Sequence, residues 1–200
     1  MNNHFYDQTF GRHADSDRIF LHTEDGDIRF DAFTAQSAQL ANALVAAGLS
    51  AGDRVAVQAE KSASLLALCA ATMRAGGVYL PLNTGYTPVE LDYFICDARP
   101  AIIIADPPAT ADIQPLADKI GATLFTLDAH GNGSLAAAAA DIRRSACRDW
   151  AAAARAGGVA VVDEALRGLV HVGARGRRYL AVVRLGRARR PVLEALRDGA

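Results

Sequence analysis

The sequence predicts an α/β fold, a layered and mostly parallel sheet with flanking helices. Short apolar segments of strand length alternate four times with longer segments whose apolar residues recur at helical spacing. One short segment, 101–105, is apolar at every position, which is typical of a parallel strand that helices cover on both faces. The 51% apolar and 22% charged composition agrees with a globular chain.

The first elements in chain order are a predicted hairpin and a helix. Residues 18–22 and 27–30 read as two strands separated by a turn that contains Gly26. Asp31 is predicted to cap the following helix, which ends at Gly48. A short buried strand is then expected over 55–57.

The second helix is predicted to begin after Ser62 and to stop at Gly76-Gly77, ahead of a strand over 78–80. Its apolar face is expected to hold Leu65, Leu66, Cys69 and Met73. The third helix has the clearest signal, because Thr87-Pro88-Val89-Glu90 is a capping box with proline at the first helical position. A fourth helix over 113–120 ends at Gly121, and a last strand is expected over 123–127.

The chain changes character near residue 140. Residues 1–140 contain eight Lys or Arg and sixteen Asp or Glu, whereas residues 141–200 contain thirteen Arg, no Lys and six acids. We therefore predict two parts: an α/β part over 1–135, and an Ala/Arg-rich segment over 136–200 that is non-homologous and weakly ordered. Such a composition is typical of a GC-rich gene translated out of frame, and we expect this origin for the segment.

Several classes of protein do not fit this sequence. No apolar run approaches the length of about 18 residues that a membrane span needs, and the N-terminus is polar, so we expect a cytoplasmic protein without membrane contact. The three cysteines, Cys69, Cys96 and Cys147, are odd in number and widely spaced, which argues against a disulfide framework or a zinc knuckle. The arginines of the Ala/Arg-rich segment lack accompanying aromatic residues and motifs, so nucleic-acid binding is not expected.

No motif for catalysis, phosphate binding or metal binding is present. The five histidines lack metal spacing, and no G-x-S-x-G, G-x-G-x-x-G or Walker sequence occurs. Gly131-Asn132-Gly133 reads as a flexible loop and Gly76-Gly77 as a helix stop. The only lysines, Lys61 and Lys119, read as surface charges, although Lys61 follows a strand end where α/β folds bind ligands. We therefore assign no catalytic, cofactor-binding or metal-binding residue.

Several phrases of the sequence nevertheless resemble a known family. They are Gly48-Leu49, Gly52-Asp53-Arg54-Val55, Glu60-Lys61-Ser62, Gly76-Gly77-Val78-Tyr79-Leu80-Pro81-Leu82-Asn83, and Tyr86-Thr87-Pro88-Val89-Glu90-Leu91. Over about residues 5–135 the chain resembles the beginning of the acyl-CoA synthetases of the adenylate-forming, AMP-binding superfamily. It is most similar among them to malonyl-CoA synthetases.

The resemblance implies a reaction in which a carboxylic acid, here malonate, ATP and CoA give acyl-CoA, AMP and pyrophosphate with Mg²⁺. In the family, the phosphate loop, the metal-binding glutamate and the catalytic lysine follow the matched region, and this chain shows none of them past residue 135. The expectation is a truncated acid–CoA ligase that is inactive and needs no cofactor as this chain. Two alternatives remain: a non-catalytic module that binds a nucleotide or CoA through residues 58–62 and 83–86, and a docking partner of another synthetase chain.

Overall fold

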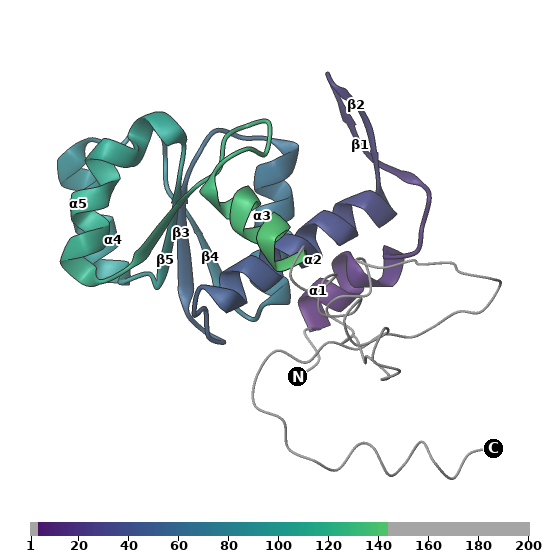
Figure 1. Ribbon diagram of the computed structural model, residues 1–200, viewed down its shortest axis with the longest axis horizontal. Coiled ribbons are helices and arrows are strands. Elements are labelled where there is room, and N and C mark those ends of the chain that lie inside the picture. Colours follow the sequence, from purple (N-terminus) through teal and green to yellow (C-terminus); the bar gives the residue numbers. More distant parts are fainter. Residues whose placement is uncertain (1–3, 144–200) are drawn as a thin grey trace, which may run out of the picture.

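The computed structural model describes residues 4–143 and contains a four-stranded parallel sheet between two layers of helices (Figure 1). The strand order is β4-β3-β5-β6. The strands are β3 (Arg54–Gln58), β4 (Val78–Pro81), β5 (Ile102–Ala105) and β6 (Thr123–Thr126). The predicted α/β class and the parallel sheet are confirmed.

The helices divide between the two faces of this sheet. Helices α2 (Phe30–Ala46) and α3 (Ala63–Arg74), together with a helix over 134–143, cover one face. Helices α4 (Pro88–Ala98) and α5 (Thr110–Ile120) cover the other face (Figure 1). Helices α3, α4 and α5 each connect two parallel strands of the sheet, as a βαβ pattern requires. Helix α2 and the helix over 134–143 complete the layer on one face.

The N-terminal elements lie beside α2. They are α1 (His4–Thr9), a short 3-10 helix over Gly11–His13, and an antiparallel hairpin of β1 (Ile19–Thr23) and β2 (Gly26–Arg29). The hairpin projects from the layered body in Figure 1. The predicted hairpin is thus confirmed, as a sheet separate from the main one.

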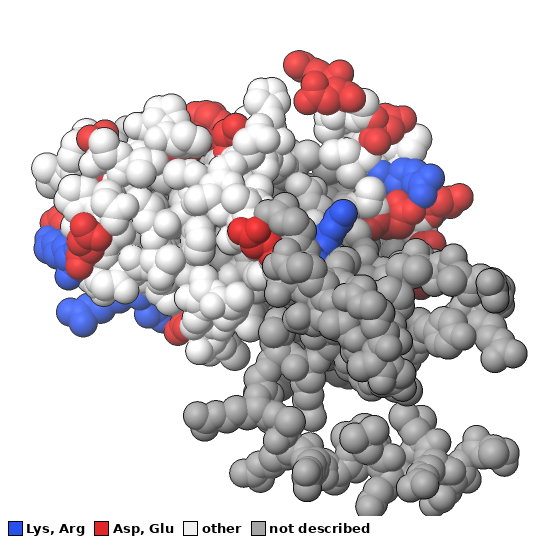
Figure 2. Space-filling model, in the orientation of Figure 1, with Lys and Arg blue, Asp and Glu red and all other residues white. Residues whose placement is uncertain are grey.

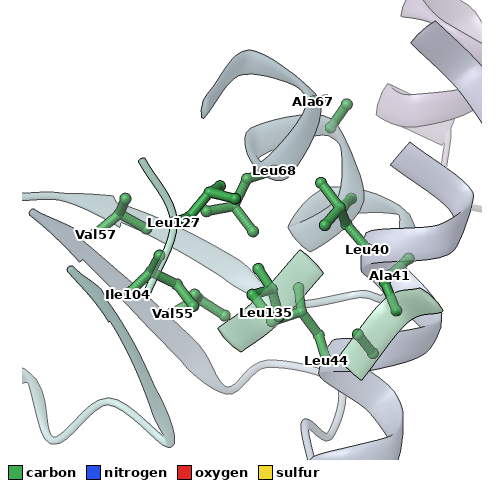
Figure 3. Packing of buried hydrophobic residues seen from close by; sticks show 14 of the residues in the cluster. Leu40, Ala41, Leu44, Val55, Val57, Ala67, Leu68, Ile104, Leu127 and Leu135 are labelled. Atoms are coloured by element: carbon green, nitrogen blue, oxygen red, sulfur yellow. The ribbon is translucent and has the colours of Figure 1, made fainter. Parts of the chain in front are cut away.

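Alternate side chains of the central strands fill two separate cores. Val55 and Val57 of β3 contact the layer of α2 and α3, while Ala56 between them faces α4 and α5. In β5, Ile104 faces the α2–α3 layer and Ile103 the other layer, and all four β5 residues are buried. Figure 3 shows Val55, Val57 and Ile104 directed toward the leucines of the first core. This confirms that the apolar run 101–105 belongs to a strand covered on both faces.

The predicted helix ends are largely confirmed. The Ser62 side chain accepts the Leu65 N–H, and Thr87 and Glu90 form a reciprocal capping box at the start of α4. Gly48, Gly76 and Gly121 follow their helices with positive φ angles, which glycine adopts without steric cost.

Two predictions about helices α2 and α3 were wrong. Asp31 does not cap α2, because β2 runs directly into the helix and Arg29 occupies the N-cap position; Asp31 pairs with Arg29 instead. In α3 the larger side chains predicted to form the apolar face are only partly buried, and the fully buried residues are Ala67, Leu68, Ala70, Ala71 and Thr72. Small alanines allow α3 to approach α2 and the sheet closely, and a pattern of large residues alone misses this.

The helix over 134–143 extends the packed body beyond residue 135. Leu135 is fully buried and Ala139 is 6% exposed, and both belong to the core that contains Leu44 (Figure 3). The boundary at 135 and the nature of the Ala/Arg-rich segment remain predictions, and residues 144–200 of that segment lie outside the described residues. Within the described chain, no helix is both long enough and apolar enough to cross a membrane.

Candidate functional site

The candidate site lies at the carboxyl ends of β3 and β5, where the chain connections diverge. After β3 the chain passes to α3 on one face of the sheet, and after β5 it passes to α5 on the opposite face. In open α/β sheets, ligands bind in the crevice at such a switch point. The topology therefore places the candidate site at the loops that follow β3 and β5, next to the loop that follows β4.

Hydrogen bonds connect these three strand ends. The Gln58 side-chain amide donates to the Asn83 carbonyl at 3.2 Å, which joins β3 to the β4 loop. The Asp106 backbone N–H donates to the Gln58 carbonyl at 3.1 Å, and the Asp106 carboxylate accepts the Glu60 N–H at 2.9 Å. The structure thus brings together the two segments singled out in the sequence, 58–62 and 83–86. The sequence did not point to Asp106, because the hydrogen bond that it accepts comes from Glu60, 46 residues away in the chain.

The loop after β4 is held against α4. Asn83 Oδ1 accepts the Gly85 N–H at 2.9 Å, and the Asn83 carbonyl accepts the Tyr86 N–H at 3.2 Å. The Tyr86 ring stacks on Phe94 with centroids 4.9 Å apart. These contacts fix the shape of the loop without the help of a ligand.

The donors at these strand ends do not fit a triphosphate. The Glu60 N–H already donates to the Asp106 carboxylate, and the Ser62 side-chain oxygen accepts the Leu65 N–H at the α3 N-cap. Glu60 and Asp106 add negative charge, and the exposed Lys61 is the single cationic side chain of residues 58–62. ATP phosphates need free N–H groups and positive charge, so this part of the chain lacks the set that would hold them.

The Gly131-Asn132-Gly133 loop also fails as a phosphate cradle. The Asp128 carboxylate accepts the Asn132 N–H at 2.7 Å, and this hydrogen bond lowers the pKa of Asp128. Gly133 has φ +136°, and a Cβ atom there would approach the Thr126 carbonyl to 2.3 Å. The expected flexible loop is therefore part of a hydrogen-bonded turn over residues 128–133. The Asp128 carboxylate in this turn would repel a phosphate.

The remaining candidates from the sequence lie apart from this edge. Lys119 pairs with Asp92 at 2.7 Å on the surface between α4 and α5, and His22 pairs with Asp27 on the hairpin. Among residues 4–143, no group of three or more His, Cys, Asp or Glu side chains is arranged to hold a metal ion. Figure 2 shows acidic side chains gathered at the hairpin. His171 and Cys147 lie outside the described residues.

Comparison with known proteins identifies the origin of this arrangement. A family model described as AMP-binding enzyme matches residues 8–163. The crystal structures of apo and ATP-bound MatB from Rhodopseudomonas palustris share 48% sequence identity with the chain at a TM-score of 0.66, covering 70% of this chain and 28% of MatB. An acyl-CoA synthetase from Brucella canis, with 22% identity and a TM-score of 0.60 over 70% of this chain and 27% of its own, shares the fold.

Curated relatives cover a similar part of the chain. Vanchrobactin synthetase VabF of Vibrio anguillarum is 39% identical over 88 residues, which is 44% of this chain and 3% of the relative. Phenylacetyl-CoA ligase epaB of Aspergillus niger is 37% identical over 83 residues, which is 42% of this chain and 15% of the relative. The chain thus spans a small part of these proteins. It belongs to the AMP-binding enzyme family.

Proposed function

We propose that the α/β part, residues 1–135, is the N-terminal portion of an acid–CoA ligase whose favoured acid is malonate. The complete enzyme would join the acid to ATP with release of pyrophosphate, and CoA would then displace AMP. The observation that carries the proposal is the 48% identity over 70% of the chain with MatB, a malonyl-CoA synthetase, compared with 22% for the Brucella canis synthetase. The malonyl-type phrases around Lys61 and Thr87 support the choice of acid.

ATP is the cofactor with the most direct support, because MatB is known in an ATP-bound crystal structure. Mg²⁺ and CoA belong to the proposal for the complete enzyme. Within residues 4–143 the donor set at the strand ends does not fit ATP phosphates, so we assign no binding residue for them in this part.

We further propose that this chain by itself does not form acyl-CoA. Adenylate formation requires hydrogen-bond donors and a metal ion arranged around the reacting phosphate, and loss of one such donor alone costs about 10² to 10³ in rate. The described strand ends contribute Glu60 and Asp106 instead, and no lysine follows Lys119 in the sequence. We therefore expect this chain to lack acyl-CoA-forming activity completely rather than to have a reduced rate.

A pyrophosphate-release assay tests both proposals. The purified full chain is incubated with malonate, ATP, Mg²⁺ and CoA, with MatB as the positive control and a blank without enzyme. We expect release from MatB and none above the blank from this chain. Release above the blank by this chain with any acid would contradict the proposed inactivity, and release only with an acid other than malonate would contradict the choice of malonate as well.

One observation favours a second candidate, a module that binds a nucleotide or CoA without chemistry. The Gln58–Asn83 and Glu60–Asp106 hydrogen bonds bring the loops after β3, β4 and β5 to one edge of the sheet. Titration of the ¹⁵N-labelled chain with CoA or ATP distinguishes the two: saturable shifts confined to these loops would support the binding module, and unchanged spectra would count against it. A docking role on another synthetase chain would show instead as co-purification with that chain.

We propose that the Ala/Arg-rich segment, residues 136–200, arises from a change of reading frame. The helix over 134–143 packs Leu135 and Ala139 into the core, and the change is to be sought from about codon 135 onward. Another frame of the downstream DNA should then encode a Ser/Thr/Gly-rich loop with a lysine, followed by the rest of a synthetase. A DNA sequence without such a frame would defeat this proposal.

A further inference from the structure

Helix α3 has apolar side chains on two opposite sides. Ala67 and Leu68 are fully buried on the side that packs into the first core (Figure 3). Leu65, Leu66 and Cys69 form the other side, the outer face of α3, and are only partly buried. A helix at the surface of a protein has one apolar stripe as a rule, whereas a helix that is apolar on all sides is buried. The sequence of α3 is thus typical of a helix that is covered on both sides.

The outer face of α3 carries no charge. Residues 63–73 contain no Asp, Glu, Lys or Arg. The guanidinium group of Arg74, at the end of the helix, donates to the Tyr6 hydroxyl of α1 at 2.7 Å. Burial raises the pKa of the Cys69 thiol and raises that of the nearby Tyr79 hydroxyl to about 12, so both groups are neutral near pH 7.

The helices on the opposite face of the sheet have a different surface. Helices α4 and α5 together contain five acidic residues and one lysine. Val89 and Tyr93 of α4 are 80% and 64% exposed, but they lie on a helix with three of these acids. A two-fold contact between identical chains places each surface against its own copy, so an acidic surface repels itself. Because residues 1–140 contain sixteen acids and eight basic residues, the uncharged outer face of α3 is the surface best suited to such a contact.

We propose that the outer face of α3 is an interaction surface for a second copy of this chain. Leu65, Leu66 and Cys69 of one copy lie against the same residues of the other, around a two-fold axis. Removal of these apolar side chains from water drives the association, and no charged group has to lose its hydration. The contact covers the side of α3 that the sequence pattern predicts to be buried and that one copy leaves partly open. The inference is independent of the proposed ligase activity.

Sedimentation velocity of the full chain over a range of protein concentrations tests the proposal. We expect the mass to rise with concentration from the monomer value of 21.1 kDa to twice that value. Leu66→Glu places a carboxylate without a partner in the contact and should raise the dissociation constant by about tenfold or more. Val89→Glu is the matched control, because it adds the same charge to an exposed apolar position of α4 and should leave the dissociation constant unchanged.

A second measurement uses the parent chain and does not depend on how the variants fold. The rates at which iodoacetamide alkylates Cys69 and Cys96 are followed by peptide mass spectrometry at several protein concentrations. Cys69 should react several-fold more slowly in the dimer, whereas Cys96, on α4, should react at the same rate in monomer and dimer. A chain that stays monomeric, or a Cys69 rate that does not change with concentration, would overturn the proposal. Equal weakening of the dimer by Leu66→Glu and Val89→Glu would overturn it as well, because the contact would then lie elsewhere.

Discussion

The Asp106 carboxylate at the end of β5 accepts the backbone N–H of Glu60 after β3, at 2.9 Å. This hydrogen bond connects two loops that leave the sheet toward opposite faces. It lies at the switch point, the position where many α/β proteins bind an anionic ligand. In this chain a side-chain carboxylate takes up the N–H group that such an anion would use.

Asp106→Ala should therefore release the loop between β3 and α3. Loss of one hydrogen bond to a charged acceptor is expected to reduce the protection of the Glu60 amide against hydrogen exchange by about tenfold. Asp106→Asn is the matched control, since its side-chain oxygen can still accept the same N–H. Equal protection in the alanine variant and the parent chain would show that the loop is held by other contacts.

The α4 capping box predicts a component of acid sensitivity. The Thr87 backbone N–H and hydroxyl both donate to the Glu90 carboxylate, and these hydrogen bonds lower the pKa of Glu90 below its ordinary value of 4.5. Because the folded-state pKa is the lower one, the stabilisation is fully present above pH 4.5 and is lost as the pH falls through the folded-state value.

Urea unfolding of Glu90→Gln at a series of pH values checks this. The variant should be less stable than the parent above pH 4.5, and the difference should shrink at lower pH. Glu24→Gln, on the exposed hairpin turn, is the control and should follow the parent chain. A difference between Glu90→Gln and the parent that does not change with pH would contradict the assignment.

Gly133→Ala should be more damaging than Gly121→Ala. Both glycines have positive φ angles, but a Cβ at position 133 would meet the Thr126 carbonyl at 2.3 Å, whereas nothing lies within 4 Å of one at position 121. Gly121→Ala carries only the left-handed backbone cost of about 1 kcal/mol, and Gly133→Ala adds a clash for a total of about 3 kcal/mol. Denaturant unfolding measures the free energy of unfolding of both variants. Equal decreases would show that the 126–133 turn can shift to make room for the Cβ atom.

Limited trypsin digestion should leave a stable product that ends near Arg143 or Arg144. The helix over 134–143 anchors the chain through Leu135 and Ala139, so cleavage sites before its end are protected by the packed body. Residues 136–200 contain few large apolar side chains to offset the ordering entropy of about 1 to 2 kcal/mol per residue. Persistence of the full-length band, checked by intact mass, would mean that the segment is folded.

Local signals in the sequence were sufficient for most elements of the described body. The capping box at Thr87 and Glu90, the N-cap at Ser62 and the glycine at position 121 act within one helical turn, so neighbouring residues alone reveal them. The uniformly apolar 101–105 likewise indicated a strand buried on both faces. The family phrases lie in these same elements and the loops that join them, which is why the resemblance could be read from the sequence.

Other features depended on packing between distant segments. The buried face of α3 is set by close contact of its alanines with α2 and the sheet, and the exposed partner of Lys119 comes from α4. Helix 134–143 joins the core because Leu135 belongs to the same buried cluster as Leu44, about ninety residues earlier.

The sequence by itself determined the fold class, the order of the elements and the family resemblance, because helix caps, turns and hydrophobic periodicity are short-range properties of the chain. Only the tertiary structure decided that Gln58, Asn83 and Asp106 lie at one edge of the sheet and that Asp106 occupies the Glu60 N–H there. The strand order places β3 between β4 and β5, so residues far apart in the chain become neighbours through sheet pairing, which no local pattern encodes.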